Sequence, residues 1–129
     1  MDRYPLEDLV AFRIAKELKD RIGTLLAPGR TRRDFGFDDQ IRRAAESIAS
    51  NIAEGHGRYN PAEFANFLRY SRASVRELQE RLPDGVTRGY YEAGEIAPIL
   101  TLLDREAAVL VGLRKSMLRL ARNRRTNRT

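Results

Sequence analysis

The sequence contains no cysteine, no tryptophan and a single histidine, His56. The missing thiols exclude disulfide scaffolds, thiolate metal sites and cysteine nucleophiles, and one imidazole cannot serve a site that needs two. There is no glycine-rich phosphate loop followed by Lys and Ser/Thr, and residues 55–57 lack the third glycine of a dinucleotide fingerprint. Many enzyme classes are therefore excluded, and we expect neither a metal nor an organic cofactor.

Long apolar runs are also missing. The most apolar stretch, residues 96–113, is interrupted at its middle by Asp104, Arg105 and Glu106. Such charges cost about 2.5 to 3.5 kcal/mol each at the centre of a bilayer. The first nine residues alternate charged and apolar side chains, which is not the pattern of a signal peptide. We therefore expect a cytoplasmic protein with no membrane partner.

The composition is that of a folded, basic domain. A chain of 129 residues with 42% hydrophobic and 33% charged residues is typical of one globular domain. The formal net charge is +6, and no acidic residue follows Glu106. The basic residues after that point are Arg114, Lys115, Arg119, Arg122, Arg124, Arg125 and Arg128. The rest of the chain is close to neutral, so the positive charge belongs to the C-terminus.

Arginine supplies all but three of the 24 basic residues. A guanidinium group matches phosphate geometry bidentately, so the excess is compatible with phosphate recognition. A GC-rich genome would favour arginine codons in the same way, and the excess is spread over every segment.

Four segments show the helical period, and none shows sustained two-residue alternation. We expect the first helix over residues 7–27, ended by Pro28-Gly29. The second is expected after Gly36, with Asp38-Asp39 at its positive end and residues 55–57 stopping it. The apolar positions of these two helices are Ala11, Ile14, Ala15, Leu18, Ile22, Leu25, Ile41, Ala45, Ile48 and Ile52.

The third helix has the clearest start, with Asn60 as N-cap, Pro61 in the first turn and Glu63 three residues after the cap. Its core positions are Phe64, Leu68, Ser71, Val75, Leu78 and Leu82. Residues 83–85, Pro-Asp-Gly, are expected to break it. The fourth helix is expected over residues 92–122. Its first stripe is Ile96, Leu100, Leu103, Ala107, Leu110, Met117 and Ala121.

Four amphipathic helices joined by short loops predict an all-α, up-down-up-down antiparallel four-helix bundle over residues 1–122. Residues 123–129 have no apolar side chain and are expected to form a flexible basic tail. Pro98 lies inside the fourth segment. The regular helix therefore starts near Pro98, or its first turns are kinked.

The fourth helix carries a second apolar stripe, rotated by roughly 90° from the first at about 100° per residue. The second stripe consists of Ile99, Leu102, Val109, Leu113 and Leu120. Either this helix is the most buried one of the monomer, or another subunit covers the stripe. We favour an oligomer interface.

Residues 40–55, QIRRAAESIASNIAEG, closely resemble the signature of the bacterial 23S rRNA intervening-sequence protein family. The resemblance continues through Asp8-Leu9 with Phe12, through residues 35–37 and through the third and fourth helices, from about residue 4 to 120. It implies a four-helix bundle that assembles as a homopentamer, with members encoded in insertions of rRNA genes. A related branch, the accessory variability determinant proteins of diversity-generating retroelements, assists a reverse transcriptase.

The signature helix is rich in small residues, which allow a neighbouring backbone to come near. These are Ala44, Ala45, Ser47, Ala49, Ser50 and Ala53. Arg42 or Arg43 is placed to pair with Glu46 one turn on. The helix is interpreted first as shaping the core, and alternatively as a subunit contact or a ligand site. The roles of Ser50, Asn51 and Glu54 stay open.

The resulting hypothesis is a non-enzymatic oligomer that binds the RNA or DNA backbone. The binding residues are expected to be the C-terminal basic residues given above, together with Arg42, Arg43 and Arg58. The alternative is a structural adaptor that docks a protein partner such as a reverse transcriptase, with the tail serving only solubility. A ribonuclease centred on His56 is disfavoured, because a histidine in a helix-terminating turn explains that residue.

Overall fold

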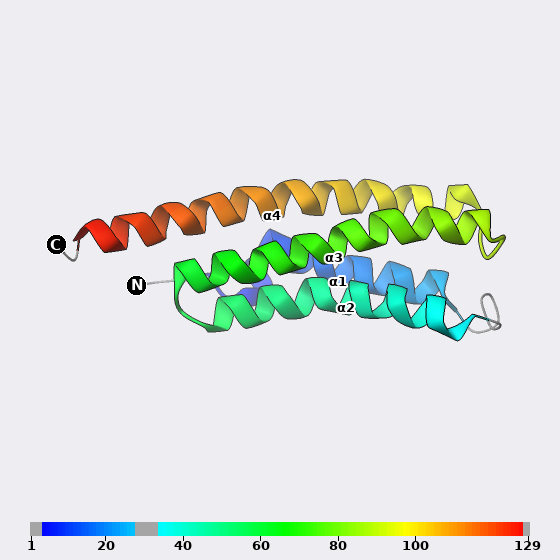
Figure 1. Ribbon diagram of the computed structural model, residues 1–129, viewed down its shortest axis with the longest axis horizontal. Coiled ribbons are helices and arrows are strands. Elements are labelled where there is room, and N and C mark those ends of the chain that lie inside the picture. The colour runs from blue at the N-terminus through cyan, green and yellow to red at the C-terminus, as the bar shows by residue number, and fades with distance from the viewer. Residues whose placement is uncertain (1–3, 28–33, 128–129) are drawn as a thin grey trace.

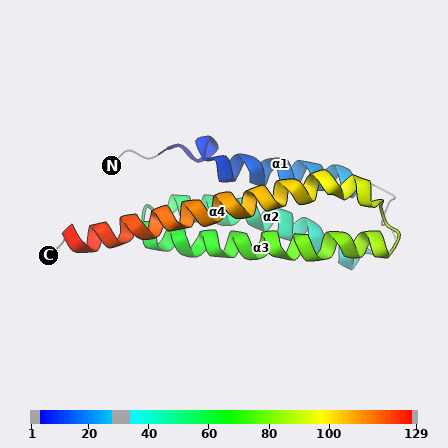
Figure 2. The same cartoon turned by 90° about the horizontal axis from the view of Figure 1, so that it is seen from above.

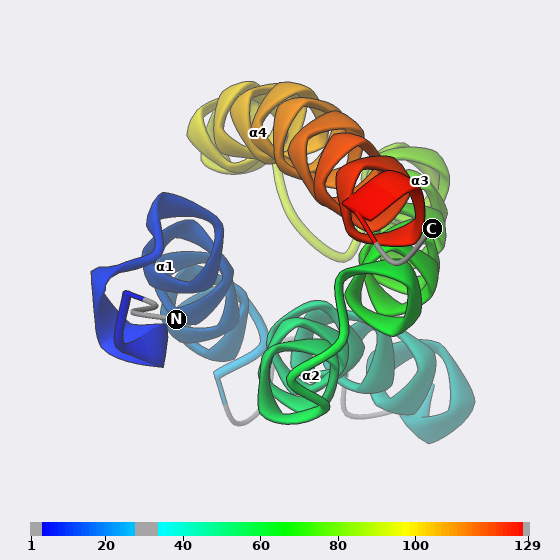
Figure 3. The same cartoon turned by 90° about the vertical axis from the view of Figure 1, so that its left-hand side faces the viewer.

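The computed structural model describes residues 4–27 and 34–127. A short 3-10 helix, η1 (Leu6–Asp8), precedes α1 (Val10–Leu25), α2 (Phe35–Gly57), α3 (Pro61–Thr87) and α4 (Ala93–Asn127). Successive helices run in opposite directions (Figure 1). Viewed from the end, they surround a shared core, and α4 packs against both α3 and α1 (Figure 3). The predicted all-α antiparallel four-helix bundle is confirmed.

The core is built from the predicted apolar stripes. Every core position predicted for the first three helices is buried. In α4, Ile96, Leu103 and Leu110 are buried, whereas Met117 and Ala121 are only partly covered. The difference arises because the last turns of α4 extend beyond the start of α1 (Figure 2). That end of α4 is supported mainly by α3 and is therefore the most accessible part of the helix.

Two of the helix starts follow local capping rules. The Asn60 side chain accepts a hydrogen bond from the Glu63 backbone N–H at 3.1 Å, with Pro61 as the first helical residue. At α4, the Glu95 side chain accepts from the Glu92 backbone N–H at 2.9 Å. This second cap starts α4 at Ala93, before Pro98, and the helix continues through the proline.

The predicted start of α2 is wrong by two residues. Asp34, not Asp38 or Asp39, is the N-cap, and it accepts from the Phe37 backbone N–H at 3.1 Å. The Tyr90 hydroxyl and the Arg88 guanidinium, the latter at 3.1 Å, hold the same carboxylate. These hydrogen bonds hold the pKa of Asp34 below its ordinary value, with the Tyr90 hydroxyl contributing most. The start of α2 is therefore fixed by contacts with the turn between α3 and α4.

The predicted break at residues 83–85 is also wrong, because α3 continues to Thr87. Pro83 removes one backbone donor, but Tyr91 packs over the following turn and donates its hydroxyl to the Leu82 carbonyl at 2.9 Å. Gly85 allows this contact, since a Cβ there would collide with the Tyr91 ring and hydroxyl. Gly85 therefore permits the close contact between α3 and the Tyr91 ring, and it does not end the helix.

The ends of α1 and α4 also differ from expectation. α1 ends at Leu25, and the predicted stop at Pro28-Gly29 lies outside the described residues. α4 continues to Asn127, so the expected flexible tail is helical up to that residue. Arginine is a good helix former, and these turns lie against the start of α3, which explains the continuation.

Small residues bring α2 and α3 together, as the signature segment predicts. The buried Ser71 hydroxyl donates to the Ile48 carbonyl at 2.8 Å, and Ser74 bonds to Ser47 at 2.8 Å. At Gly55, a Cβ would lie only 2.7 Å from the Phe67 Cβ. Side chains longer than these would separate the helices. The small residues therefore shape the core of the bundle.

The polar residues of the signature segment bond within α2. Asn51 donates to the Ser47 carbonyl and hydroxyl, both at 2.9 Å, and Ser50 makes a longer bond to the same carbonyl. Glu54 pairs with Arg58 at 3.0 Å. These contacts give Ser50, Asn51 and Glu54 local structural partners.

One ionisable side chain lies in the core. Glu106 is 0% exposed, and neither of its carboxylate oxygens has a hydrogen-bond partner among the described residues. Burial raises the pKa of Glu106 to about 8, and Arg105 opposes this shift only in part. The carboxyl is therefore protonated in the folded protein at neutral pH.

We expect this carboxyl to make stability depend on pH. Unfolding returns the Glu106 pKa to its ordinary value of 4.5. Its stabilising effect is complete below pH 4.5 and is lost as pH rises towards 8, at about 1.4 kcal/mol per pH unit. Glu106→Gln keeps the shape of the protonated side chain and should flatten this dependence. Urea unfolding of both proteins between pH 5 and pH 8 measures the effect, and parallel pH profiles would contradict it.

Candidate nucleic-acid interface

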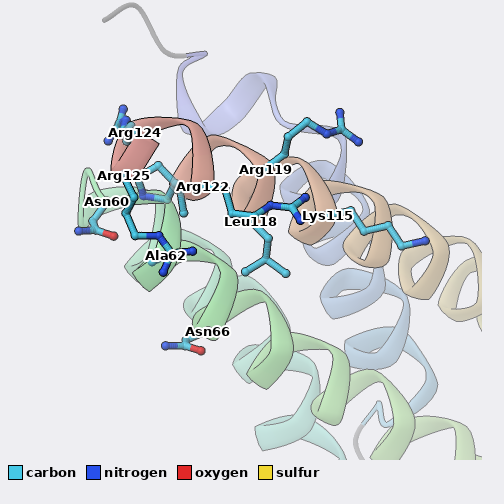
Figure 4. A pocket seen from close by; sticks show the side chains of 11 residues that line it. Asn60, Ala62, Asn66, Lys115, Leu118, Arg119, Arg122, Arg124 and Arg125 are labelled. Atoms are coloured by element: carbon cyan, nitrogen blue, oxygen red, sulfur yellow. The ribbon is translucent and has the colours of Figure 1, made fainter. Parts of the chain in front are cut away.

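The C-terminal turns of α4 and the first turns of α3 enclose a groove of about 720 Å³. Figure 4 shows its basic side chains projecting from α4 beside the start of α3. From α3, the groove is lined by Asn60, Pro61, Ala62 and Asn66. From α4, it is lined by Lys115, Leu118, Arg119, Ala121, Arg122, Arg124 and Arg125. Five of the basic residues predicted from the sequence therefore share one site.

The electrostatics of this groove favour an anion. No Asp or Glu lines it. The first backbone N–H groups of α3 place the positive end of a helix dipole beside the arginines. Glu63 lies in the same turn but does not line the groove, and its carboxylate is 3.6 Å from Arg58. Like charges are thus gathered in a hollow whose described lining residues include no carboxylate.

Most arginines on the first three helices are paired with acids. Ion pairs between residues one turn apart join Arg21 to Glu17, Arg43 to Asp39, Arg58 to Glu54 and Arg81 to Glu77. The side chains of Lys115, Arg119, Arg122 and Arg125 form no ion pair within residues 4–27 and 34–127. Their charges remain available to an external anion.

The other predicted basic residues lie elsewhere. Arg42 donates to the Leu26 carbonyl at 2.9 Å, so it closes the end of α1, and the partner of Arg43 is Asp39 rather than the predicted Glu46. Arg58 lies over the Phe67 ring, 5.1 Å from its centroid.

Arg114 is partly covered, and its Nε lacks a hydrogen-bond partner in the described part of the chain. None of Arg42, Arg43, Arg58 and Arg114 lines the groove. Arg128 lies outside the described residues.

Sequence reasoning missed three basic residues on α3. Arg69, Arg72 and Arg76 line a smaller hollow of about 390 Å³ between α3 and α4. They are separated from one another by two or three uncharged residues and are followed by Glu77 and Glu80, so they do not form an uninterrupted run of positive charge. Their spacing of three and four residues was the available signal, because it places them on one face of a helix.

An apolar cavity of about 470 Å³ lies at the same end of the bundle, between the N-terminal segment and α4. Its apolar walls include Leu9, Phe64, Leu113, Met117 and Leu120. Two of these belong to the predicted oligomer interface. Leu102 and Val109 of that interface are partly buried, whereas Ile99 is 3% exposed inside the single chain and is removed from the candidate surface.

His56 lies in the last turn of α2, at the mouth of this cavity. Its Nε2 is 2.9 Å from the Tyr4 carbonyl oxygen, and its ring meets the Phe64 ring edge-on. Across the described residues, no group of three or more His, Cys, Asp or Glu side chains is placed to hold a metal ion. Nor does any described helix have the length and apolar character to cross a membrane.

Comparisons with known proteins agree with this fold. A structure of a protein of unknown function from the S23 ribosomal protein family of Bacteroides thetaiotaomicron is similar, with a TM-score of 0.73 and 22% sequence identity. The match covers 82% of this chain and 99% of that chain. Comparison with curated proteins gives no match. The family model described as 23S rRNA-intervening sequence protein matches residues 7–112, and the chain therefore belongs to this family.

Proposed function

We propose that this protein is a non-enzymatic binder of the RNA or DNA backbone, and that the groove between the start of α3 and the end of α4 is its binding site. The observation that carries the proposal is a set of four cations, Lys115, Arg119, Arg122 and Arg125, that form no ion pair with a described residue and lie in a groove that no described acid lines. Phosphate is the anion that nucleic acids present repeatedly, and arginine contacts it through two parallel N–H bonds.

The chemistry of the groove supports sequence-independent binding. Its cations neutralise phosphates and release counterions, so affinity should fall steeply with salt concentration. Only Asn60 and Asn66 add neutral polar side chains to the lining, which leaves little means of reading base edges. The same groove therefore accepts RNA or DNA, and the cytoplasm, which needs no disulfides, is the proposed place of action.

The family match ends at residue 112, before the first basic residue of the groove. The proposed binding site therefore depends on residues of this chain's own α4 that lie beyond the family match. The family description names a 23S rRNA intervening sequence, which supports RNA as the ligand.

Removing three groove arginines should weaken binding and its salt dependence together. The triple variant Arg119→Gln, Arg122→Gln and Arg125→Gln keeps helix propensity while removing three phosphate contacts. The slope of log affinity against log salt should fall by about 2 on single strands, at about 0.7 per contact. Fluorescence anisotropy with labelled oligonucleotides between 50 and 200 mM KCl measures it.

The matched control replaces Arg13, Arg21 and Arg43 by glutamine. It removes the same charge from α1 and α2, where each arginine is paired with an acid. The control should keep nearly the wild-type affinity. Equal losses in the two triple variants would show that net charge, and not the groove, determines binding.

We also propose that the protein is a homo-oligomer, with the pentamer implied by its family resemblance as the expected form. The partly buried stripe of Leu102, Val109, Leu113 and Leu120 supports this, since it continues into the apolar cavity. The same surface supports the alternative function, an adaptor that docks a protein partner such as a reverse transcriptase. If the protein is an adaptor, the triple arginine variant should still bind the protein partner. The wild-type protein should then not bind nucleic acid at physiological salt.

Charge introduced into the apolar stripe should dissociate the oligomer. Sedimentation equilibrium of the wild-type protein at micromolar concentration should give a mass several times 14.8 kDa. Leu102→Glu or Val109→Glu should give the monomer mass while far-UV circular dichroism remains helical, because an unpaired charge cannot be buried at an interface. A wild-type protein that sediments as a monomer contradicts the assembly.

The non-enzymatic proposal is tested at His56. His56→Ala removes a contact with the N-terminal segment but no proton transfer. Oligonucleotide affinity should stay within about twofold of wild type, which is a change of roughly 0.4 kcal/mol. Incubation with labelled RNA should produce no cleavage by either protein. Cleavage by the wild type that disappears in His56→Ala would make the protein a ribonuclease.

A further inference from the structure

The two basic hollows lie one after the other along the same pair of helices, α3 and α4. On α3, their wall runs through Ala62, Asn66, Arg69, Ala73 and Arg76, which are spaced alternately by four and three residues. On α4, the wall includes Arg125, Arg122, Leu118 and Lys115 at the same kind of spacing, and then Ala107 two turns earlier. Such spacing keeps side chains on one face of a helix. The two antiparallel helices lie side by side over this distance (Figure 1).

The positive charge comes from α4 in the first hollow and from α3 in the second. Arg72 forms no ion pair within the described ranges, and the Arg69 guanidinium lies 5.5 Å from the centroid of the Tyr70 ring. Arg76 is 3.7 Å from Glu80, but both side chains are largely exposed, so that pair is weak. The groove ends where Gln79 donates to the Asp104 carboxylate at 2.9 Å.

The length of the groove sets the length of ligand that fits. From Asn60 to Gln79, α3 advances about 29 Å at about 1.5 Å per residue. A stacked strand has one phosphate per roughly 3.4 Å, so about eight nucleotides span the groove. The α4 part alone, from Lys115 to Arg125, advances about 15 Å and spans about four nucleotides.

The straight course of the groove distinguishes between single and double strands. Each strand of a duplex winds around the axis once in about 34 to 36 Å. Over the length of this groove, it would turn away from the protein for much of its course. A single strand can extend along both hollows and meet the α4 cations in the first and the α3 arginines in the second.

We infer that the two hollows between α3 and α4 form a continuous binding track for a single-stranded nucleic-acid segment of about eight nucleotides, with Arg69, Arg72 and Arg76 supplying the positive charge of its second half. This inference rests on the proposed function and extends it from the basic residues at the end of α4 to basic residues of α3. The chemistry recognised is the sugar-phosphate backbone, which RNA and DNA share.

The test uses the variant Arg69→Gln, Arg72→Gln and Arg76→Gln in the full chain. Its probes are labelled oligouridylates of 4, 8 and 12 nucleotides and a 12-base-pair RNA duplex. Wild-type affinity should rise clearly from 4 to 8 nucleotides. The variant should lose most of that gain, with a salt slope on the 8-mer lower by up to about 2, at about 0.7 per contact. Its binding of the 4-mer should be nearly unchanged.

Circular dichroism of the variant excludes a loss of fold. The control variant, in which Arg13, Arg21 and Arg43 are replaced, excludes a general charge effect. An 8-mer that binds this variant with wild-type affinity and slope overturns the track, while the proposed function stands if the α4 triple variant loses binding. If the α4 triple variant binds with wild-type affinity, the proposed function itself is contradicted. Duplex affinity greater than that of the 12-mer overturns the single-strand assignment.

Discussion

The close contact between α2 and α3 is the constraint on which the other parts of the structure depend. Ser71 and Ser74 on α3 bond to α2, and Gly55 leaves room for the Phe67 side chain. These contacts position α3 so that its opposite side receives α4. The basic groove is a consequence, because its α3 wall lies on the helix that α2 holds in place. A bulkier residue at Gly55 would therefore disturb the groove without touching a basic side chain.

Among the described residues, the end of α4 gathers cations in a hollow that no acid lines. Along α1, α2 and part of α3, carboxylates one turn away neutralise arginines, and such exposed pairs contribute little to stability. Their effect on binding is greater, because they cancel the field that each arginine would project. After Glu106, α4 has no acid, and its cations lie beside the positive end of α3. The paired arginines on α1 and α2 are thus neutralised by neighbouring acids, whereas arginines at the end of α4 can attract anions.

The parts of the fold that could be predicted from the sequence were those determined by local spacing. The core stripes and the Asn60 cap depend on residues within a few turns of one another. The start of α2 and the end of α3 could not be predicted in this way. Asp34 is held by Tyr90, and Tyr91 supports the helix beyond Pro83, so these contacts join segments that a local pattern treats separately.

The candidate site shows the same division. Its α4 wall was predicted because the basic residues follow one another without an acid, whereas Arg69, Arg72 and Arg76 are directly followed by Glu77 and then by Glu80, which offset their charge in the sequence. Only the packing of α4 against α3 shows that these arginines line a hollow between the same two helices as the α4 cations. The position of Arg42 and Arg43 outside the groove could not be predicted either. It depends on their partners, which are the Leu26 carbonyl for Arg42 and Asp39 for Arg43.

The geometry of α4 allows assembly and ligand binding to take place on different surfaces. Leu113 and Leu120 are seven residues apart and share one side of the helix, and Lys115 and Arg122 share another in the same way. The two pairs are offset by two residues, which is about 200° around the helix. A subunit packed on the apolar side would therefore leave the basic groove open. Each added subunit would contribute another groove, and a strand that reaches two of them binds the second at a high effective concentration. Modest affinity in one chain is then sufficient for tight binding by the assembly.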